Sequence, residues 1–289
     1  MYKGEDGYLD LQSQVILSGK DRGDRTGTGT SSLFSAQLMF DLRDSFPLLT
    51  TKKMAFNSII GELLWFLSGR TNLETLRWFT FGDPDSDKRT IWDDNVGAWD
   101  DGVFGDGLGG GFIYGKQWRN FQGAFRTNHD QVASLLGEAK NNPESRRLLV
   151  NAWNSAEIEA DLMCLPPCHF AWQVYIEDGY LNLKWNQRSC DLFLGIPFNI
   201  ASYAALTHLL AHWLGLKPGY LIGDLTNVHI YKNHFDAVAE QLSRRPINCN
   251  TKLVIPEDIN LSNLEDFWAG DFSIENYQSH PPIKAPMAV

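Results

Sequence analysis

The sequence predicts an α+β fold in which helices pack around a mixed β-sheet. Stretches with apolar residues at helical spacing occur between stretches in which apolar and polar residues alternate. The clearest case is a hairpin: residues 169–176 and 180–185 flank Asp178-Gly179, a pair that supplies the positive φ angles of a tight turn. Ten tryptophans and a hydrophobic content of 43% provide for a substantial core.

The same periodicities predict the other elements. In order, they are a strand over 33–42, a helix over 57–67 ended by Gly69, a helix over 130–142, a strand over 148–150, a buried helix over 200–215 and a helix over 233–243. Residues 80–113 are rich in Asp and Gly and are expected to be irregular; such long loops are often functional. Because no linker or repeat interrupts the chain, residues 1–289 are expected to form a single domain.

Charge and composition exclude several classes of protein. A net charge of -10 disfavours nucleic-acid binding, although a local arginine cluster can still hold a small phosphate. The first residues contain no apolar stretch, so no signal peptide is expected, and no apolar run is long enough to predict a membrane span. The four cysteines (Cys164, Cys168, Cys190, Cys249) fit a reducing cytoplasm, and neither they nor the histidines have metal-site spacing, so no metal is expected.

Cys168 is the candidate nucleophile. A nearby cation would lower the pKa of its thiol, and the candidates are Arg188 and the pair Arg146-Arg147. The alternative is that Cys168 is a small buried apolar group. A papain-like hydrolase would need His229 and Asn199 as partners, and nothing local supports those roles.

The hairpin register constrains the surroundings of Cys168. With Asp178 and Gly179 as the turn, Cys168 opposes Ser189 and His169 opposes Arg188. Alternation then places Cys168 and His169 on opposite faces, so His169 is a poor base for the thiol. A bulge in the second strand is expected to bring Arg188 to Cys168.

Other polar residues have both a functional and a structural interpretation. The runs Asp24–Thr30, Ser145–Arg147 and Gln187–Ser189 each place arginine beside hydroxyl or glycine residues, a pattern suited to phosphate but also to surface ion pairs. Glu62, inside an apolar helix, is either paired structurally or has a raised pKa suited to proton transfer. His229 and Tyr231 share one face, as ligands of one hydroxyl or as a core pair.

Together these segments resemble the thymidylate synthase family along nearly the whole chain. The motifs that carry the resemblance are Asp24–Thr30, Glu62–Leu67, Tyr114–Arg119, Ser145–Arg147, Ala152–Asn154, Pro167–His169, Gln187–Asp191, Phe193–Tyr203, His229–Tyr231 and Ile283–Val289. The resemblance implies methylation of dUMP to dTMP, with 5,10-methylenetetrahydrofolate as donor of the one-carbon unit and the hydride. Cys168 would add to C6 of uracil.

The resemblance also implies a role for each site residue. Glu62 would run a proton network, Tyr114 would order the water that removes the C5 proton, Asn199 would hold the N3–H/O4 edge of uracil, and Asp191 would orient the pterin. Arg25, Arg188 and Ser189 would bind the phosphate with Arg146 and Arg147 of the second subunit of a homodimer formed through a sheet face, and His229 and Tyr231 would bind the 3′-hydroxyl. Ile91, Trp92, Leu165, Gly195, Phe198 and Ala288 would line the folate site, and Lys52 would meet a polyglutamate tail.

Four departures from the family pattern lie near the expected ligands: Asn186, the run Thr226–Val228, the run Gly109–Gly111, and Gly61. They leave open a second outcome, that of the phage pyrimidine hydroxymethylases, in which water quenches the C5-methylene intermediate to give 5-hydroxymethyl-dUMP. Trp92 and the C-terminal tail, which would exclude water, favour the synthase. A silent nucleotide-binding or RNA-binding homologue is disfavoured by the presence of Cys168, Glu62 and Asn199 together.

Overall fold

The computed structural model describes residues 1–98, 111, 113–123 and 127–287. Its strands are β1 (Tyr2–Lys3), β2 (Lys20–Arg22), β3 (Thr30–Asp41), β4 (Phe121–Gln122), β5 (Asn128–His129), β6 (Leu149–Asn151), β7 (His169–Glu177), β8 (Tyr180–Gln187), β9 (Cys190–Asp191), β10 (Lys217–Tyr231), β11 (Lys252–Val254) and β12 (Ser273–Glu275). Its α-helices are α1 (Gly4–Ser18), α2 (Phe56–Ser68), α3 (Leu73–Phe81), α4 (Asp93–Ala98), α5 (Tyr114–Arg119), α6 (Gln131–Asn141), α7 (Ser155–Glu159), α8 (Gly195–Leu214) and α9 (Phe235–Leu242). Short 3₁₀ turns are η2 (Lys232–His234), η3 (Leu264–Asp266) and η4 (Ala269–Asp271).

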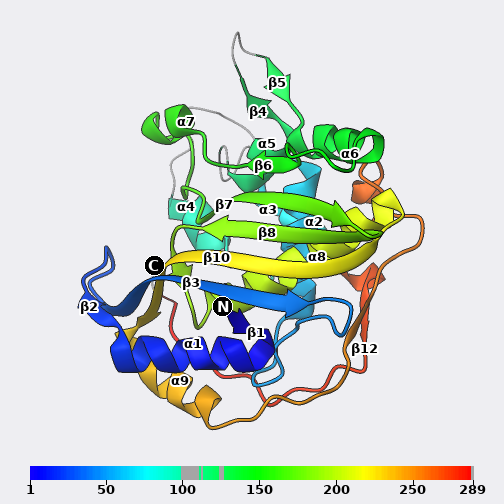
Figure 1. Ribbon diagram of the computed structural model, residues 1–289. Helices are drawn as coiled ribbons and strands as arrows, with labels where there is room; N and C mark the ends of the chain where they lie inside the picture. The colour runs from blue at the N-terminus through cyan, green and yellow to red at the C-terminus, as the bar shows by residue number, and fades with distance from the viewer. Residues whose placement is uncertain (99–110, 112, 124–126, 288–289) are drawn as a thin grey trace.

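One eight-stranded mixed sheet organises the chain. Its strand order is β1-β3-β10-β8-β7-β6, with β2 paired to β3 and β9 paired to β10. The β8–β10 pair is parallel and joined through α8, whereas β3–β10, β7–β8 and β6–β7 are antiparallel. Helices α2, α3 and α8 lie behind this sheet in Figure 1, and its opposite face is turned toward the viewer and is not covered by any helix of the described residues. The predicted α+β class with a mixed sheet is confirmed.

The predicted hairpin is confirmed, with one correction. Asp178 (φ 51°) and Gly179 (φ 79°) form the turn, and the expected pairing holds as far as Ala171 opposite Asn186. The register then shifts, so that His169 pairs with Gln187. The extra residue is Phe170 in the first strand, so the prediction of a bulge in the second strand is wrong. An extra residue on the first strand is what moves Arg188 into line with Cys168.

The predicted helices are present, with different ends. Helix α2 ends where Gly69 adopts a left-handed conformation (φ 79°), and Asp130 caps α6 by accepting a hydrogen bond from the Ala133 N–H. Helix α8 begins at Gly195, five residues before the predicted start. The carboxylate of Asp191 accepts hydrogen bonds from the N–H groups of Phe193 and Leu194, the two residues that precede this helix.

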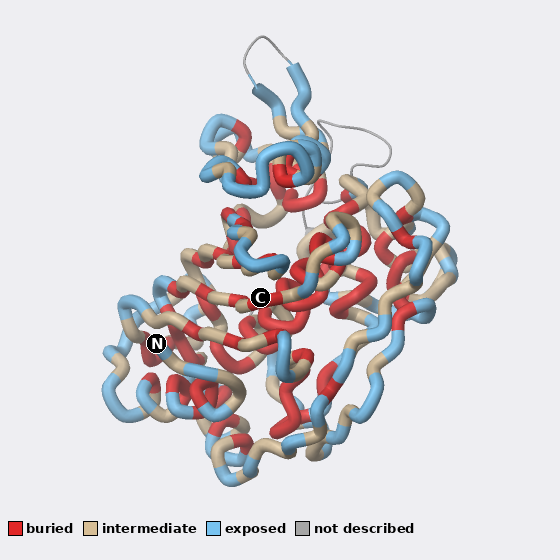
Figure 2. Tube along the Cα trace, turned by 45° about the vertical axis from the view of Figure 1, so that its right-hand side comes forward, coloured by how far each residue is buried: buried red, intermediate tan, exposed pale blue. Residues whose placement is uncertain are grey.

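The core lies between the sheet and the helices behind it. The buried stretches in Figure 2 gather there, whereas the β4–β5 arm is exposed. Part of the segment expected to be irregular is helical, because α3 reaches Phe81 and α4 spans Asp93–Ala98. Residues 82–92 lie outside helices and strands, and residues 99–110 and 112 lie outside the described residues. None of the helices in the described ranges is both long and apolar enough to cross a membrane.

Candidate active site

Cys168 lies at the bulged end of the β7–β8 hairpin, where two elements fix its backbone. The N–H of Arg188 donates to the carbonyl of Cys168 at 2.9 Å, and the N–H of Cys168 donates to the hydroxyl of Tyr114 at 2.7 Å. Tyr114 is the first residue of α5 and is buried. The nucleophile predicted from the sequence therefore lies directly beside both Arg188 and Tyr114.

Two arginines act on the thiol of Cys168. Burial raises the pKa of Cys168, while the charges of Arg188 and then Arg25 act in the opposite direction. The guanidinium of Arg188 donates to the carbonyls of Pro166 and Pro167, both at 2.9 Å. These bonds hold the cation beside the cysteine and use part of its five-donor fork, which leaves donors for a ligand.

His169 belongs to the core. Its Nδ1 lies 2.8 Å from the hydroxyl of Tyr203, and its ring stacks on Tyr114 at 4.0 Å between centroids. Burial lowers the pKa of His169 to about 3, so the imidazole is neutral at physiological pH. This environment agrees with the prediction that His169 does not serve as the base for Cys168.

Glu62 projects from α2 into an aromatic environment. The indole Nε1–H of Trp92 donates to its carboxylate at 2.6 Å, and the Trp92 ring lies 6.2 Å from that of Tyr114. Burial raises the pKa of Glu62 to about 7, against the opposing effect of the Trp92 hydrogen bond. Of the two interpretations of Glu62, a carboxylate that takes up and releases a proton near neutral pH is the one this geometry favours.

The amide of Asn199 faces the same region from α8. Its Oδ1 accepts a hydrogen bond from Gln187 Nε2 at 3.1 Å, and the same Nε2 donates to the carbonyl of Ser189 at 3.0 Å. The motif Gln187–Asp191 does not by itself assign a role to Gln187, although alternation with Trp185 along β8 indicates that this side chain is buried. The structure thus joins Asn199 and Ser189 through one buried amide.

The loop that carries Arg25 connects β2 to β3 and is held by Asp24. The Asp24 carboxylate accepts from the N–H groups of Thr26 at 2.7 Å and Gly29 at 2.6 Å. Gly27 and Gly29 have φ angles of 74° and 79°, which glycine adopts without strain. Arg25 itself is exposed at the tip of this loop.

The Arg25 loop, the end of the β7–β8 hairpin and the end of β10 lie close enough for their charged groups to act on Tyr231. Burial raises the pKa of Tyr231, and the charges of Asp191, Asp24, Arg25 and Cys168 all act on the same hydroxyl. The ring of His229 packs edge-on against Tyr231 at 5.3 Å, as expected for residues on one face of β10. His229 also pairs with Asp191 of β9. The loop, the hairpin end and the C-terminal end of β10 therefore form one site.

The other predicted residues are less uniformly placed. Leu165, Gly195 and Phe198 are partly buried, Trp92 is buried, and Ile91 is half exposed at the surface. Arg146 and Arg147 are exposed in the loop before β6. Ala288 lies outside the described residues.

Lys52 has an unexpected environment. Its ammonium donates to the carbonyl of Phe193 and lies 3.8 Å from the centroid of the Phe193 ring. Burial lowers the pKa of Lys52 to about 8, although the charge of Asp191 acts in the other direction. The expected contact with a polyglutamate tail stays a prediction, and it requires this side chain to turn outward.

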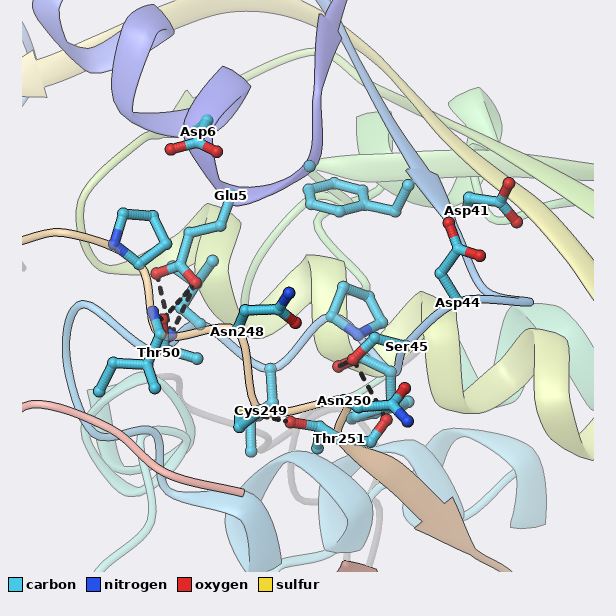
Figure 3. A pocket seen from close by; sticks show the side chains of 18 of the residues that line it. Glu5, Asp6, Asp41, Asp44, Ser45, Thr50, Asn248, Cys249, Asn250 and Thr251 are labelled. Atoms are coloured by element: carbon cyan, nitrogen blue, oxygen red, sulfur yellow. Dashed lines mark hydrogen bonds between the residues drawn. The ribbon is translucent and has the colours of Figure 1, made fainter. Parts of the chain in front are cut away.

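A cavity of about 930 Å³ lies elsewhere, between the start of α1, the loop after β3 and residues 245–251. Figure 3 shows Glu5 pointing from α1 toward Thr50. The Glu5 carboxylate accepts hydrogen bonds from the N–H and hydroxyl groups of both Thr50 and Thr51, at 2.7–2.9 Å. Glu5 thereby ties the loop to α1, and none of the predicted site residues lines this cavity.

Comparison with known proteins agrees with this geometry. The family model described as thymidylate synthase matches residues 6–289. A relative from Escherichia phage T5, described as "Probable thymidylate synthase", is 51% identical over 290 residues, which cover 97% of this chain and 99% of the relative. With Cys168, Tyr114, Glu62 and Asn199 gathered around one site, the chain belongs to the thymidylate synthase family of one-carbon transferases.

Proposed function

We propose that this protein converts dUMP to dTMP, with 5,10-methylenetetrahydrofolate as co-substrate, through addition of the Cys168 sulfur to C6 of uracil. The observation that carries the proposal is the position of Cys168, whose N–H donates to the Tyr114 hydroxyl and whose carbonyl accepts from the N–H of Arg188. The thiolate is the attacking form of cysteine, and the charges of Arg188 and Arg25 favour it against the effect of burial. As the S–C6 bond forms, the electron pair of the C5–C6 double bond moves toward O4 and makes C5 nucleophilic.

Asn199 supplies recognition of the base. A carboxamide donates and accepts, so it matches the N3–H donor and the O4 acceptor of uracil. The Gln187 N–H bound to Asn199 Oδ1 fixes the acceptor end of this amide. The base would then be oriented with C6 toward Cys168.

Glu62 supplies proton transfer. A group with a pKa of about 7 is populated in both protonation states at neutral pH, and this is the condition under which general acid–base catalysis is most efficient. The Trp92 N–H orients the carboxylate. Tyr114, which bonds to the Cys168 N–H, is placed to order a water that takes the proton from C5.

The nucleotide phosphate and sugar would bind across the converging loops. Arg25, Arg188 and Ser189 are suited to the phosphate, because guanidinium forks hold phosphate oxygens in pairs. His229 and Tyr231, in edge-to-face contact at the end of β10, are suited to the 3′-hydroxyl. The fixed Asp24 loop presents Arg25 to this ligand.

The folate would lie against the apolar side of the site. It supplies the one-carbon unit and the hydride when bound. The residues proposed to contact it are Ile91, Trp92, Leu165, Asp191, Gly195, Phe198 and Ala288, with Lys52 for the tail. Trp92 is buried and packs on Trp65, Phe66 and Tyr114, so it closes one side of the site to water and favours hydride transfer over hydration.

The protein is further proposed to act as a homodimer in the cytoplasm. The sheet face without helices in Figure 1 is the surface that a second copy would cover. Large hydrophobic side chains are exposed on β3 (Phe34, 84%), β7 (Tyr175, 64%) and β6 (Leu149, 46%). Arg146 and Arg147, just before β6, would then reach the phosphate of the partner subunit. All four cysteines are free, as is typical of a reducing compartment.

Product identification tests the proposed reaction. The protein is incubated with dUMP and 5,10-methylenetetrahydrofolate, the nucleotide is identified by mass, and dihydrofolate is followed by absorbance. The proposal expects dTMP and dihydrofolate in equal amounts. Formation of 5-hydroxymethyl-dUMP without dihydrofolate would show that water replaces hydride, and an unchanged nucleotide would refute both reactions.

A further inference from the structure

Trp185 packs against Gly223 of β10 and is hydrogen-bonded to Gln187, and the absence of a side chain at Gly223 makes room for the indole ring. Trp185 is fully buried on the inner face of β8 and is registered with Gly223 on β10. A Cβ atom at position 223 would lie 2.4 Å from two ring carbons of Trp185. The indole therefore rests directly on the β10 backbone at Gly223, where almost no displacement is possible.

The indole begins a chain of hydrogen bonds that ends at Asn199. Trp185 Nε1–H donates to Gln187 Oε1 at 3.1 Å, and Gln187 Nε2 donates to Asn199 Oδ1 at 3.1 Å. Gln187 is buried, with 4% of its surface exposed. Its Nε2 also donates to the Ser189 carbonyl at 3.0 Å.

The donor-to-acceptor direction of these hydrogen bonds is set by the Trp185 indole and the Ser189 carbonyl, whose roles cannot change. An indole N–H can only donate, and a backbone carbonyl can only accept. Trp185 therefore requires the oxygen of the Gln187 amide, and Ser189 requires its nitrogen. Because Gln187 then presents N–H groups to Asn199, it requires the oxygen of the Asn199 amide.

We propose that Trp185 is a positioning residue for base selection, which acts through Gln187 to hold Asn199 in the orientation that matches uracil. This inference rests on the proposed function, in which Asn199 binds the N3–H/O4 edge. Cytosine presents an acceptor at N3 and a donor at its 4-amino group, so Asn199 would have to turn over to bind it. A turned Asn199 amide would place its own N–H groups against those of Gln187. If the Gln187 amide turned as well, its N–H groups would face the indole N–H of Trp185.

The preference for uracil over cytosine therefore depends on the Trp185 indole N–H, a group that can only donate. Replacement of the indole by a benzene ring removes the fixed donor. A water in the space left behind can donate or accept, so the Gln187 amide is then directed by Ser189 alone. Phenylalanine keeps an aromatic ring for the stacking with Tyr203, which is at 5.3 Å and nearly parallel in the native protein.

The test compares Trp185→Phe with a matched control in the same sheet. Trp172 lies opposite Trp185 on β7 and is fully buried, and among the described residues its indole nitrogen has no hydrogen-bond partner. Trp172→Phe makes the same change in volume without removal of a hydrogen bond. Calorimetry with dUMP and with dCMP gives the ratio of the two dissociation constants for the native protein and both variants.

Trp185→Phe is expected to lower the preference for dUMP over dCMP by roughly three- to tenfold, the range for one neutral hydrogen bond. Trp172→Phe is expected to keep the native ratio. Parallel weakening of both nucleotides in Trp185→Phe, or an equal fall of the ratio in Trp172→Phe, would overturn the inference. Native protein that binds no dUMP would instead refute the proposed function.

If Trp185→Phe does not fold, 3-benzothienylalanine at position 185 provides the same test, because its sulfur replaces the indole N–H in a ring system of nearly the same shape. The same fall in the ratio is expected, and a native ratio would overturn the inference.

Discussion

The Trp92 indole is expected to set the pH at which Glu62 works. Trp92→Phe removes the N–H that donates to the Glu62 carboxylate at 2.6 Å, while the ring can still pack on Trp65, Phe66 and Tyr114. This hydrogen bond stabilises the ionised form of Glu62, so its loss must raise a pKa that is already about 7.

The size of the effect follows from the geometry. A hydrogen bond to a charged group is worth about 1.5–3 kcal/mol, which corresponds to roughly one to two pKa units. Although the Glu62 carboxylate is desolvated, part of the residue's surface stays accessible to water that can replace the lost donor, so the lower end applies and a rise of about one unit is expected. The limb of the pH–rate profile that Glu62 controls should move from near pH 7 to near pH 8.

The assay is the pH dependence of kcat for dTMP formation, measured in parallel for Trp92→Phe and Trp78→Phe. Trp78, on α3, donates from its indole to the Glu265 carbonyl at 3.2 Å. The control variant therefore loses an indole hydrogen bond that does not involve Glu62. A profile that keeps its limb near pH 7 in Trp92→Phe, or that moves equally in Trp78→Phe, would refute the assigned role of the indole.

Two further predictions concern Glu62 and the dimer. Burial places the pKa of Glu62 at about 7 in the folded chain against an ordinary value of 4.5, so its ionisation costs stability as pH rises through this interval. Glu62→Gln, which does not ionise, should therefore raise the melting temperature more at pH 8 than at pH 5, and an equal gain at both would contradict this sign. If Arg146 serves the partner site, Cys168→Ser and Arg146→Ala proteins mixed and allowed to exchange subunits should regain about a quarter of native activity, since half the dimers then carry one complete site. Activity no greater than that of the separate variants would contradict a shared site.

Local patterns were sufficient for the elements whose signals are local. The hairpin was predictable because Asp178-Gly179 specifies both the turn and the register beyond it. Helices α2 and α6 were predictable because apolar spacing agrees with a terminal Gly69 or a capping Asp130. In these cases propensity, pattern and capping favour the same structure.

The elements that depend on distant partners were not predictable. The long strand β10 contains Pro218, Gly219 and Gly223, which usually interrupt strands, and it is held by ladders to β3 and β8 on either side. The turn before α8 is held by the Asp191 carboxylate, and the bulge lies in a hairpin whose strands also pair with β6 and β10. The hydrophobic pattern within one segment gives no information about its contacts with distant segments.

The candidate site shows the same division. Cys168, Glu62 and Asn199 could be nominated from residue type and motif, and the structure gathers them. The link from Trp185 through Gln187 to Asn199 joins three residues on two elements, so it required the fold. Lys52 shows the converse, since a lysine expected to face a ligand is buried against Phe193.

Release of tritium from C5 of labelled dUMP, in the presence of 5,10-methylenetetrahydrofolate, tests the role of Cys168 most directly. Cys168→Ser is compared with Cys164→Ser, because Cys164 lies in the same segment and burial raises its pKa to about 11. Cys168→Ser is expected to abolish release, whereas Cys164→Ser is expected to retain it. Release at the native rate from Cys168→Ser would show that another group attacks the uracil ring.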